Sequence, residues 1–313
     1  MLQFKNILVV SSSEERDRNA LELGLELAGR SGGKLTVANA VRLSPHPERF
    51  RGGSSDGFRD VLSRAADDGL QEIVQDLPDL QSAIKTRVLL GPPAMEMVRE
   101  VMRSGHDLVI KTAGGSGSLT DRLLGSVDMR LLRWCPCPVW IVKGEEGPEP
   151  GRILAAVDPS REERPNPELN RKILEISVDL ARSRDADLHV LHAWAAWGES
   201  LMRSRLSSEE METYVEATRT HAVEALSDLL RPFEDQILPS QWHLIEGEPE
   251  DAIGGFIKAN EVGLVVMGTV GRTGIPGFVM GNTAEAILER VECSVLAVKP
   301  EGFQTPVELD ETD

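Results

Sequence analysis

The chain has 313 residues, of which 51 are acidic and 34 basic, so its net charge is −17. This length fits about two domains of ~150 residues, each large enough to bury a core. No stretch reaches the ~18 apolar residues of a membrane span, and the apolar run near the start predicts a first strand, not a signal peptide. Three cysteines, Cys135, Cys137 and Cys293, are too few for a disulfide framework and favour the cytoplasm.

The charge is unevenly distributed along the chain. Residues 1–148 hold 19 basic and 20 acidic side chains, whereas the remainder holds 15 and 31. A nucleic-acid binder needs a basic face to neutralise phosphates, and the second half would repel a polyanion. We therefore expect no nucleic-acid partner and no membrane partner.

Short β-branched, apolar segments alternate with segments of helical period along the first half. Strands are expected at 6–10, 34–41, 84–90, 107–112 and 137–143, with helices such as 18–30 and 93–104 between them. In the segment SGGKLT, Gly32 is predicted to end the first helix as its C-cap rather than to bind phosphate. Cys135 and Cys137 are predicted to be buried where the fifth strand begins. Strands alternating with helices predict a parallel sheet covered on both faces.

The second half repeats the first. A constant offset of 156 aligns residues 89–143 with residues 245–299 without a gap, and an offset of 146 aligns the two first strands. The second set of strands is expected at 152–157, 187–194, 240–246, 263–268 and 294–299, with a long amphipathic helix at 214–230. The segment GEEGPEPG (144–151) is a predicted linker. The expected domains are residues 1–147 and 151–300, followed by an acidic tail at 301–313.

A ligand in an open α/β sheet binds beyond the carboxyl ends of the strands, where the strand order reverses. The simplest arrangement places the first and fourth strands side by side, so the residues that follow them face one crevice. In the second copy these are Asp158 and the loop GTVGRTGIPGFVMGNT (268–283). Glycines let backbone N–H groups approach an anion, and a helix beginning near Asn282 would direct its positive end at it. The carboxylate of Asp158 could accept hydrogen bonds from a ribose or a base.

This combination of ILAAVDPS, the glycine loop and SVLAVK resembles the universal stress protein family, and the duplication most resembles its tandem E type. The resemblance covers residues 5–299 and implies two doubly wound α/β domains, each a five-stranded parallel sheet of order 3-2-1-4-5. It implies ATP, with Mg²⁺, as the ligand of the second copy and a regulatory role in the stress response rather than catalysis. The residues that the family pattern assigns to the nucleotide are Asp158, Gly268, Gly271, Arg272, Gly281, Asn282 and Thr283. Asn282 departs from the pattern, which has a hydroxyl residue there.

The resemblance also implies that the two copies pack as a pseudo-dimer within one chain, with further self-association possible. The first copy has Ser12 where the second has Asp158, and Thr112 where the second has Gly268, whereas Gly115, Gly125 and Ser126 survive. We expect the Cβ of Thr112 to occupy the place of a phosphate contact, and Ser12 cannot replace a carboxylate. The first copy is therefore predicted to have lost or weakened nucleotide binding.

Other interpretations stay open from the sequence. The glycine loop could be only a strand-to-helix connection, and Asp158 a turn residue beside Pro159. The protein could then be a nucleotide-free interaction scaffold, a slow ATPase, or a binder of an apolar or lipid-linked molecule through the loop that holds Trp194 and Trp197. His189 and His192 lie on opposite faces of one strand, which argues against a shared metal, and a core role is favoured for His192. No catalytic residues and no metal ligands are predicted.

Overall fold

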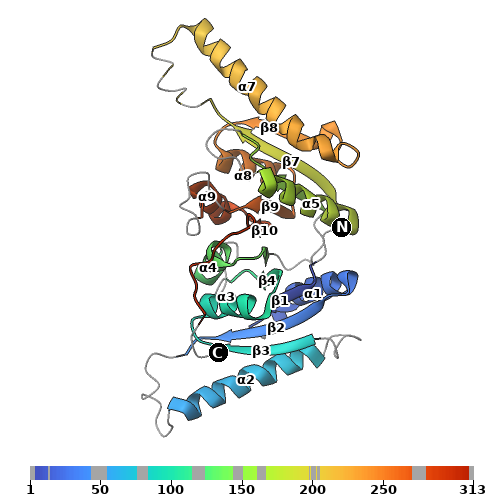
Figure 1. Ribbon diagram of the computed structural model, residues 1–313, viewed down its shortest axis with the longest axis vertical. Coiled ribbons are helices and arrows are strands. Elements are labelled where there is room, and N and C mark those ends of the chain that lie inside the picture. The colour runs from blue at the N-terminus through green and yellow to red at the C-terminus, as the bar shows by residue number, and fades with distance from the viewer. Residues whose placement is uncertain are drawn as a thin grey trace.

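A computed structural model describes residues 4–12, 15–43, 55–75, 84–114, 124–143, 151–160, 167–196, 198, 202, 205–269 and 280–309. Its strands and helices alternate through both halves of the chain (Figure 1). Within the described residues, no helix combines the length and apolar character needed to span a bilayer.

The first copy forms the predicted elements almost residue for residue. Its strands are β1 (Asn6–Val10), β2 (Lys34–Val41), β3 (Ile84–Leu90), β4 (Leu108–Thr112) and β5 (Val139–Val142). Its helices are η1 (Glu15–Asp17), α1 (Arg18–Ser31), α2 (Ser55–Gln75), α3 (Pro93–Ser104) and α4 (Ser126–Trp134). Gly32 ends α1 in the left-handed region, with φ 60°, which confirms the predicted C-cap.

The second copy repeats this order. Its strands are β6 (Arg152–Ala156), β7 (Asp187–Trp194), β8 (Trp242–Glu246), β9 (Leu264–Gly268) and β10 (Ser294–Val298). Its helices are α5 (Pro167–Arg184), α7 (Ser208–Leu230), α8 (Pro249–Ala259) and α9 (Asn282–Arg290), with short turns η4 (Arg231–Phe233) and η5 (Pro239–Gln241). A capping box between Ser207 and Glu210 starts the long helix α7 earlier than its apolar period alone indicated.

The two sheets join into a single sheet of ten strands with the order β3-β2-β1-β4-β5-β10-β9-β6-β7-β8. Each copy has the expected order 3-2-1-4-5 with parallel pairing. At the junction β5 and β10 pair antiparallel, with Trp140 opposite Leu296. The expected pseudo-dimer is therefore a continuous sheet, in which the strands of the two copies run in opposite directions.

A hydrophobic core covers each face of this sheet, and both cores extend across the junction. Helices α1, α2, α5 and α7 contribute to one core, and α3, α4, α8 and α9 to the other (Figure 1). The alternation of neighbouring residues explains the division, because Ile7 and Val9 point into the first core, and Leu8 and Val10 into the second. Such strands are buried on both faces, so their sequences are continuously apolar.

Equivalent lysines of the two copies reach across the junction. The Nζ of Lys299, just after β10, donates to the carbonyl of Leu132 at 2.7 Å, in the last turn of α4. The Nζ of Lys143, just after β5, donates to the carbonyl of Val291 at 2.6 Å, at the end of α9. The last turn of a helix carries unpaired carbonyls and partial negative charge, which an ammonium group stabilises. Each copy thus caps a helix of the other.

The segment after β10 was expected only as an acidic tail, but its described part returns to the first copy. Figure 1 shows it running from β10 past α4 and α3. The ring of Phe303 lies 4.6 Å from the Nζ of Lys299, and Val307 is buried in the second core. Arg99 of α3 donates to the carbonyl of Glu308 at 3.1 Å. This segment covers Lys299 and leaves that side chain almost inaccessible.

Burial lowers the pKa of Lys299 from 10.5 to about 8. The unfolded chain then binds more protons than the native protein between these values, so this lysine makes the free energy of unfolding rise with pH from about 8 to 10.5, by about 3 kcal/mol. We predict that Lys299→Met removes this rise, measured by urea unfolding across that range. Lys258→Met, at an exposed position of α8, is the control. An unchanged pH dependence in Lys299→Met would contradict the assignment.

Candidate functional site

The carboxyl ends of β6 and β9 lie side by side in the second copy. The two strands pair in parallel, with Ala156 opposite Met267. Asp158 follows the first of these strands by two residues, and Gly268 is the last residue of the second. The topology thus brings Asp158 and the start of the glycine loop to one edge of the sheet, as the sequence predicted.

The backbone at Asp158 is fixed by Asn170, a residue that the sequence had not indicated. The Asp158 N–H donates to Oδ1 of Asn170 at 3.0 Å, and Nδ2 of Asn170 donates to the Asp158 carbonyl at 2.7 Å. Asn170 is buried on α5, so both bonds hold the loop against that helix. The carboxylate of Asp158 accepts from the Ser160 hydroxyl at 2.7 Å and is only partly buried. It therefore remains an acceptor at the sheet edge.

Gly268 has a packing role that the sequence had not indicated. A Cβ at this position would lie 2.8 Å from Cδ2 of Leu169 and 3.8 Å from Cδ1 of Ile173, both on α5. The missing side chain therefore makes room for the packing of α5 on the sheet. At Gly268 the direction of a Cβ is thus occupied by a buried leucine, and the loss of a phosphate contact through Thr112 in the first copy stays a prediction.

The glycine loop is closed at its described ends by a backbone hydrogen bond. The N–H of Gly281 donates to the carbonyl of Thr269 at 3.0 Å. The hydroxyl of Thr269 accepts from Nζ of Lys299 at 2.6 Å, which ties the loop to the junction between the copies. Gly271 and Arg272 lie outside the described residues. The amide of Gly281, expected to contact phosphate, has an internal partner.

Helix α9 begins directly after this closure. Asn282 and Thr283 are its first two residues, and the N-cap Gly281 offers no side-chain hydrogen bond. Position N3 is Ala284, which has no acceptor. Glu285 in the same turn pairs instead with Arg133 of α4 at 2.7 Å. Among the residues that the structure describes, no side chain caps the N-terminus of α9, so its first amides are suited to an external anion.

In the first copy, the residues at the carboxyl ends of the equivalent strands β1 and β4 are arranged around Asp17. Its carboxylate accepts the N–H of Ser12 at 2.6 Å and the Ser12 hydroxyl at 2.8 Å, so it takes the part that Asn170 plays in the second copy. Thr112 donates its hydroxyl to the carbonyl of Arg16 at 3.3 Å, which fastens the end of β4 to η1. The first copy thus has Ser12 where the second has Asp158, and the carboxylate near this position belongs to the buried Asp17 instead. Gly115 is outside the described residues.

A second buried carboxylate, Asp128, holds the loop that follows β4. Its Oδ2 accepts the amides of Gly114 at 2.7 Å and Gly125 at 2.9 Å. Its Oδ1 lies 2.9 Å from Nζ of Lys111. Asp128 is fully buried and is residue N3 of α4, where a carboxylate typically caps the helix. Its position three residues after Gly125 is the sequence signal that could have identified it.

The other candidate residues have structural partners. His192 is buried, with Nδ1 3.3 Å from the carbonyl of Val157, which supports its interpretation as a core histidine. His189 lies against His243, with Nδ1 and Nε2 3.0 Å apart, and burial lowers the pKa of both. Trp194 is buried at the end of β7, and Trp197 is outside the described residues. Within the described ranges, no three His, Cys, Asp or Glu side chains are placed to hold a metal ion.

The three cysteines are buried thiols at the junction, in agreement with the prediction for Cys135 and Cys137. The sulfurs of those two are 3.5 Å apart. Burial raises the pKa of Cys293 to about 11, which leaves this thiol protonated at neutral pH.

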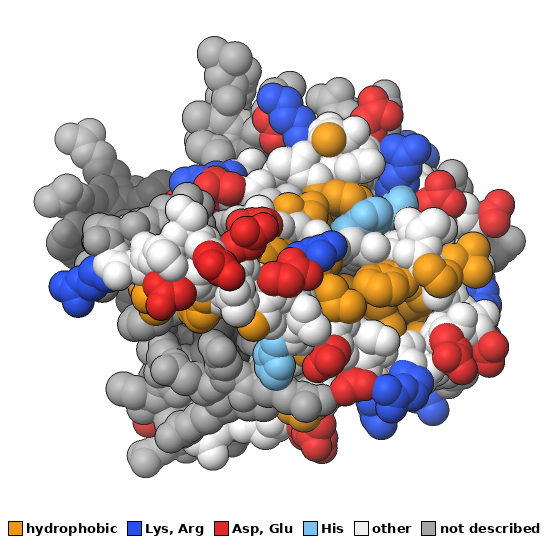
Figure 2. Space-filling view, turned by 90° about the horizontal axis from the view of Figure 1, so that it is seen from above, with side chains coloured by type: hydrophobic (Ala, Val, Ile, Leu, Met, Phe, Trp, Pro, Cys, Tyr) orange, Lys and Arg blue, Asp and Glu red, His pale blue; other side chains and the backbone are white. Residues whose placement is uncertain are grey.

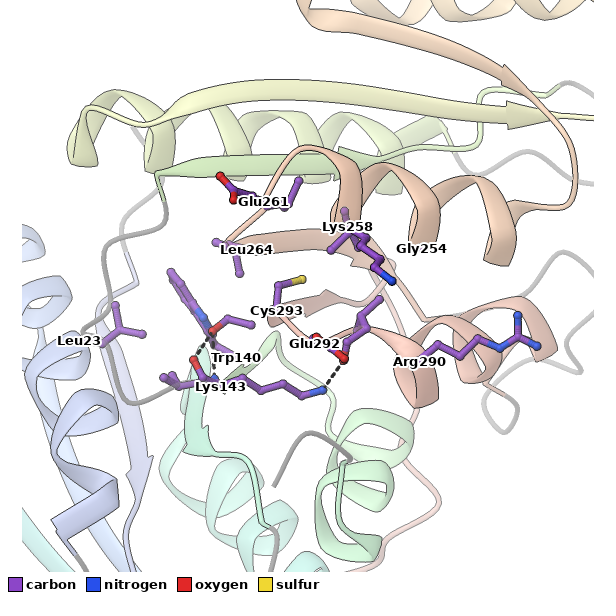
Figure 3. Close-up of a pocket in the computed structure, with 16 residues that line it drawn as sticks. Leu23, Trp140, Lys143, Gly254, Lys258, Glu261, Leu264, Arg290, Glu292 and Cys293 are labelled. Atoms are coloured by element: carbon purple, nitrogen blue, oxygen red, sulfur yellow. Dashed lines mark hydrogen bonds between the residues drawn. The ribbon is translucent and has the colours of Figure 1, made fainter. Parts of the chain in front are cut away.

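A cavity of about 940 Å³ lies at the junction, away from the glycine loop (Figure 3). Trp140 and Lys143 line it from the first copy, and Leu264 and Cys293 from the second. Leu264 begins β9, whereas Gly268 ends it, so the cavity and the predicted nucleotide site lie at opposite ends of that strand.

Far from this cavity, the surface at the α7–β8 end of the molecule carries many acidic side chains beside half-exposed hydrophobic ones (Figure 2). Basic side chains lie on the same face, while the second half as a whole has 31 acidic against 15 basic residues.

Comparison with known proteins identifies relatives over the full length. The model of the universal stress protein family matches residues 3–143 and 150–299. Universal stress protein E of Escherichia coli K12 is 31% identical over 324 aligned positions, covering 100% of this chain and 99% of that protein. A homologue of it in Haemophilus influenzae is 29% identical, covering 96% and 98%.

Solved structures share the fold. A protein of unknown function from Pseudomonas aeruginosa PAO1, PA1789, superposes with a TM-score of 0.69 at 25% identity, covering 95% of this chain and 93% of its own. A universal stress protein from Archaeoglobus fulgidus gives a TM-score of 0.66 at 19% identity, covering 96% and 100%. Both likenesses extend over the two copies together.

The contact at Gly268 generates a test. We predict that Gly268→Ala lowers the free energy of unfolding by about 1–3 kcal/mol, because the new Cβ overlaps Leu169. Gly254→Ala is the matched control: a Cβ there meets nothing within 4 Å, and alanine in α8 should stabilise by about 0.5–1 kcal/mol. Thermal or urea unfolding measures both. Equal stability of Gly268→Ala and wild type would show that the site does not pack as described.

Proposed function

Since the chain belongs to the universal stress protein family, we propose that it is a stress-response regulator that binds ATP with Mg²⁺ in its second copy. In this proposal the carboxylate of Asp158 accepts hydrogen bonds from the adenosine. The N-terminal amides of α9, at Asn282 and Thr283, bind the phosphates together with the loop that contains Gly271 and Arg272. The site acts by binding rather than by turnover.

The proposal rests on one observation, the N-terminus of α9, which lacks a capping side chain among the described residues. Its N3 position is Ala284. A helix N-terminus with unpaired amides attracts an anion through both hydrogen bonding and the helix dipole. Asp158 lies at the same edge of the sheet as a partly buried acceptor. The helix N-terminus therefore suits the anionic phosphates of a nucleotide, and the carboxylate suits the hydrogen-bond donors of its adenosine.

A nucleotide-free scaffold is the second candidate, and one observation favours it. Two glycines of the pattern already have structural roles, because Gly268 packs under Leu169 and the Gly281 amide bonds to Thr269. In that case the loop would be a strand-to-helix connection that Lys299 holds in place. The continuous sheet would then present a fixed surface to protein partners.

Titration of the full chain with Mg-ATP distinguishes the two candidates. We predict saturable binding with one site per chain in isothermal titration calorimetry, and a melting temperature that rises with ATP concentration. Asp158→Ala should weaken binding about tenfold, because a hydrogen bond to a charged group is lost. Ser12→Ala, the equivalent change in the first copy, should leave the affinity unchanged. Absence of both heat and melting shift in the wild type would favour the scaffold.

A further inference from the structure

Described residues at the two ends of the loop after β4 in the first copy surround a negatively charged group of the protein itself, the carboxylate of Asp128. Asp128 is 0% exposed; its Oδ2 accepts two backbone amides, and its Oδ1 forms an ion pair with an ammonium group. The amides of Gly114 and Gly125 stand at the two ends of the loop, and the ammonium of Lys111 comes from β4. Converging backbone amides with a neighbouring cation form the kind of donor set that binds phosphate oxygens.

The ends of the loop approach each other closely at this point. A Cβ on Gly125 would lie 2.5 Å from the carbonyl oxygen of Gly114, so only glycine permits the approach. The carboxylate of Asp128 bridges both amides with a single oxygen. The donors are therefore held in a converging arrangement, and the buried amides need an acceptor to satisfy them.

The second copy lacks both charged members of this arrangement. With the offset of 156, Lys111 corresponds to Met267 and Asp128 to Ala284, whereas Gly125 corresponds to Gly281. Met267 and Ala284 are both buried. The anion is thus supplied internally in one copy and absent from the equivalent position of the other.

We propose that the first copy retains a phosphate-type anion site whose natural occupant is its own Asp128, with Lys111 as counter-ion. The carboxylate excludes external phosphate by occupying the shared donors and by its negative charge. The amides of Gly114 and Gly125 are consequently occupied whether or not nucleotide is present, and only the second copy can respond to a ligand. The response of the second copy rests on the proposed function, but the internal occupation of the first does not.

Two variants open the site, and one keeps it closed. Asp128→Ala installs the residue of the second copy and leaves Lys111 available to a ligand. Lys111→Met with Asp128→Ala reproduces the second copy at both positions and avoids a buried unpaired ammonium, so it preserves the test where the single variant folds poorly. Asp128→Asn retains an acceptor oxygen of the same size without the charge, and is the closed control.

The probe is inorganic tripolyphosphate, added to the full-length ¹⁵N-labelled chain, and the readout is the amide signals of Gly114 and Gly125. We expect both opening variants to show saturable shifts of these signals, with Asp128→Ala binding about tenfold more tightly through Lys111. Wild type and Asp128→Asn should show no shift of these two signals. With Mg-ATP, calorimetry of Asp128→Ala should give one site per chain more than wild type.

The outcomes separate this inference from the proposed function. Failure of wild type to bind ATP, with tripolyphosphate binding at Gly114 and Gly125 in the opening variants, contradicts only the proposed function. Unchanged Gly114 and Gly125 signals in a cooperatively folded Lys111→Met/Asp128→Ala chain overturn the inference. Shifts of the same magnitude in wild type would also overturn it, because Asp128 would then not exclude the anion.

Discussion

The antiparallel pairing of β5 with β10, where Trp140 faces Leu296, turns two five-stranded sheets into one. Each copy alone would leave its fifth strand as an exposed apolar edge, and the pairing covers both. Because the strands of the two copies run in opposite directions, their carboxyl ends lie at opposite edges of the sheet. The site of the second copy and the equivalent site of the first therefore face away from each other. Both hydrophobic cores continue through the same junction, so the two copies fold against a shared interior.

The junction also buries the ammonium group of Lys299, whose loss of hydration has a free-energy cost. A buried ammonium loses hydration, and the lowered pKa of Lys299 reflects that loss. Its bonds to the end of α4 and to the Thr269 hydroxyl offset part of the cost. One side chain thus connects a helix of the first copy to the glycine loop of the second. The equivalent Lys143 of the first copy caps the C-terminus of α9 in the second. Each copy therefore caps the helix that follows the fourth strand of the other.

The two copies share a backbone frame and differ in how its polar groups are satisfied. In the first, Asp17 and Asp128 supply carboxylates to the turn after β1 and the loop after β4. In the second, the neutral Asn170 takes the first of these positions and Ala284 the second. A carboxylate in the donor set competes with an external anion, and an alanine does not. The asymmetry between the copies is therefore one of internal charge rather than of fold.

Local signals in the sequence determined the repeat, the strands, the helices at 18–30 and 93–104 and the C-cap at Gly32, because hydrophobic period and cap residues act over a few positions. The general topology of open α/β sheets placed Asp158 near Gly268, and resemblance to a family supplied the full strand order. Tertiary structure alone decided that the sheets merge, that Gly268 makes room for Leu169, and that Asp128 bonds to Gly114. These outcomes depend on contacts between elements that the folded chain brings together. The spacing of residues along the sequence specifies local structure but not which elements come into contact.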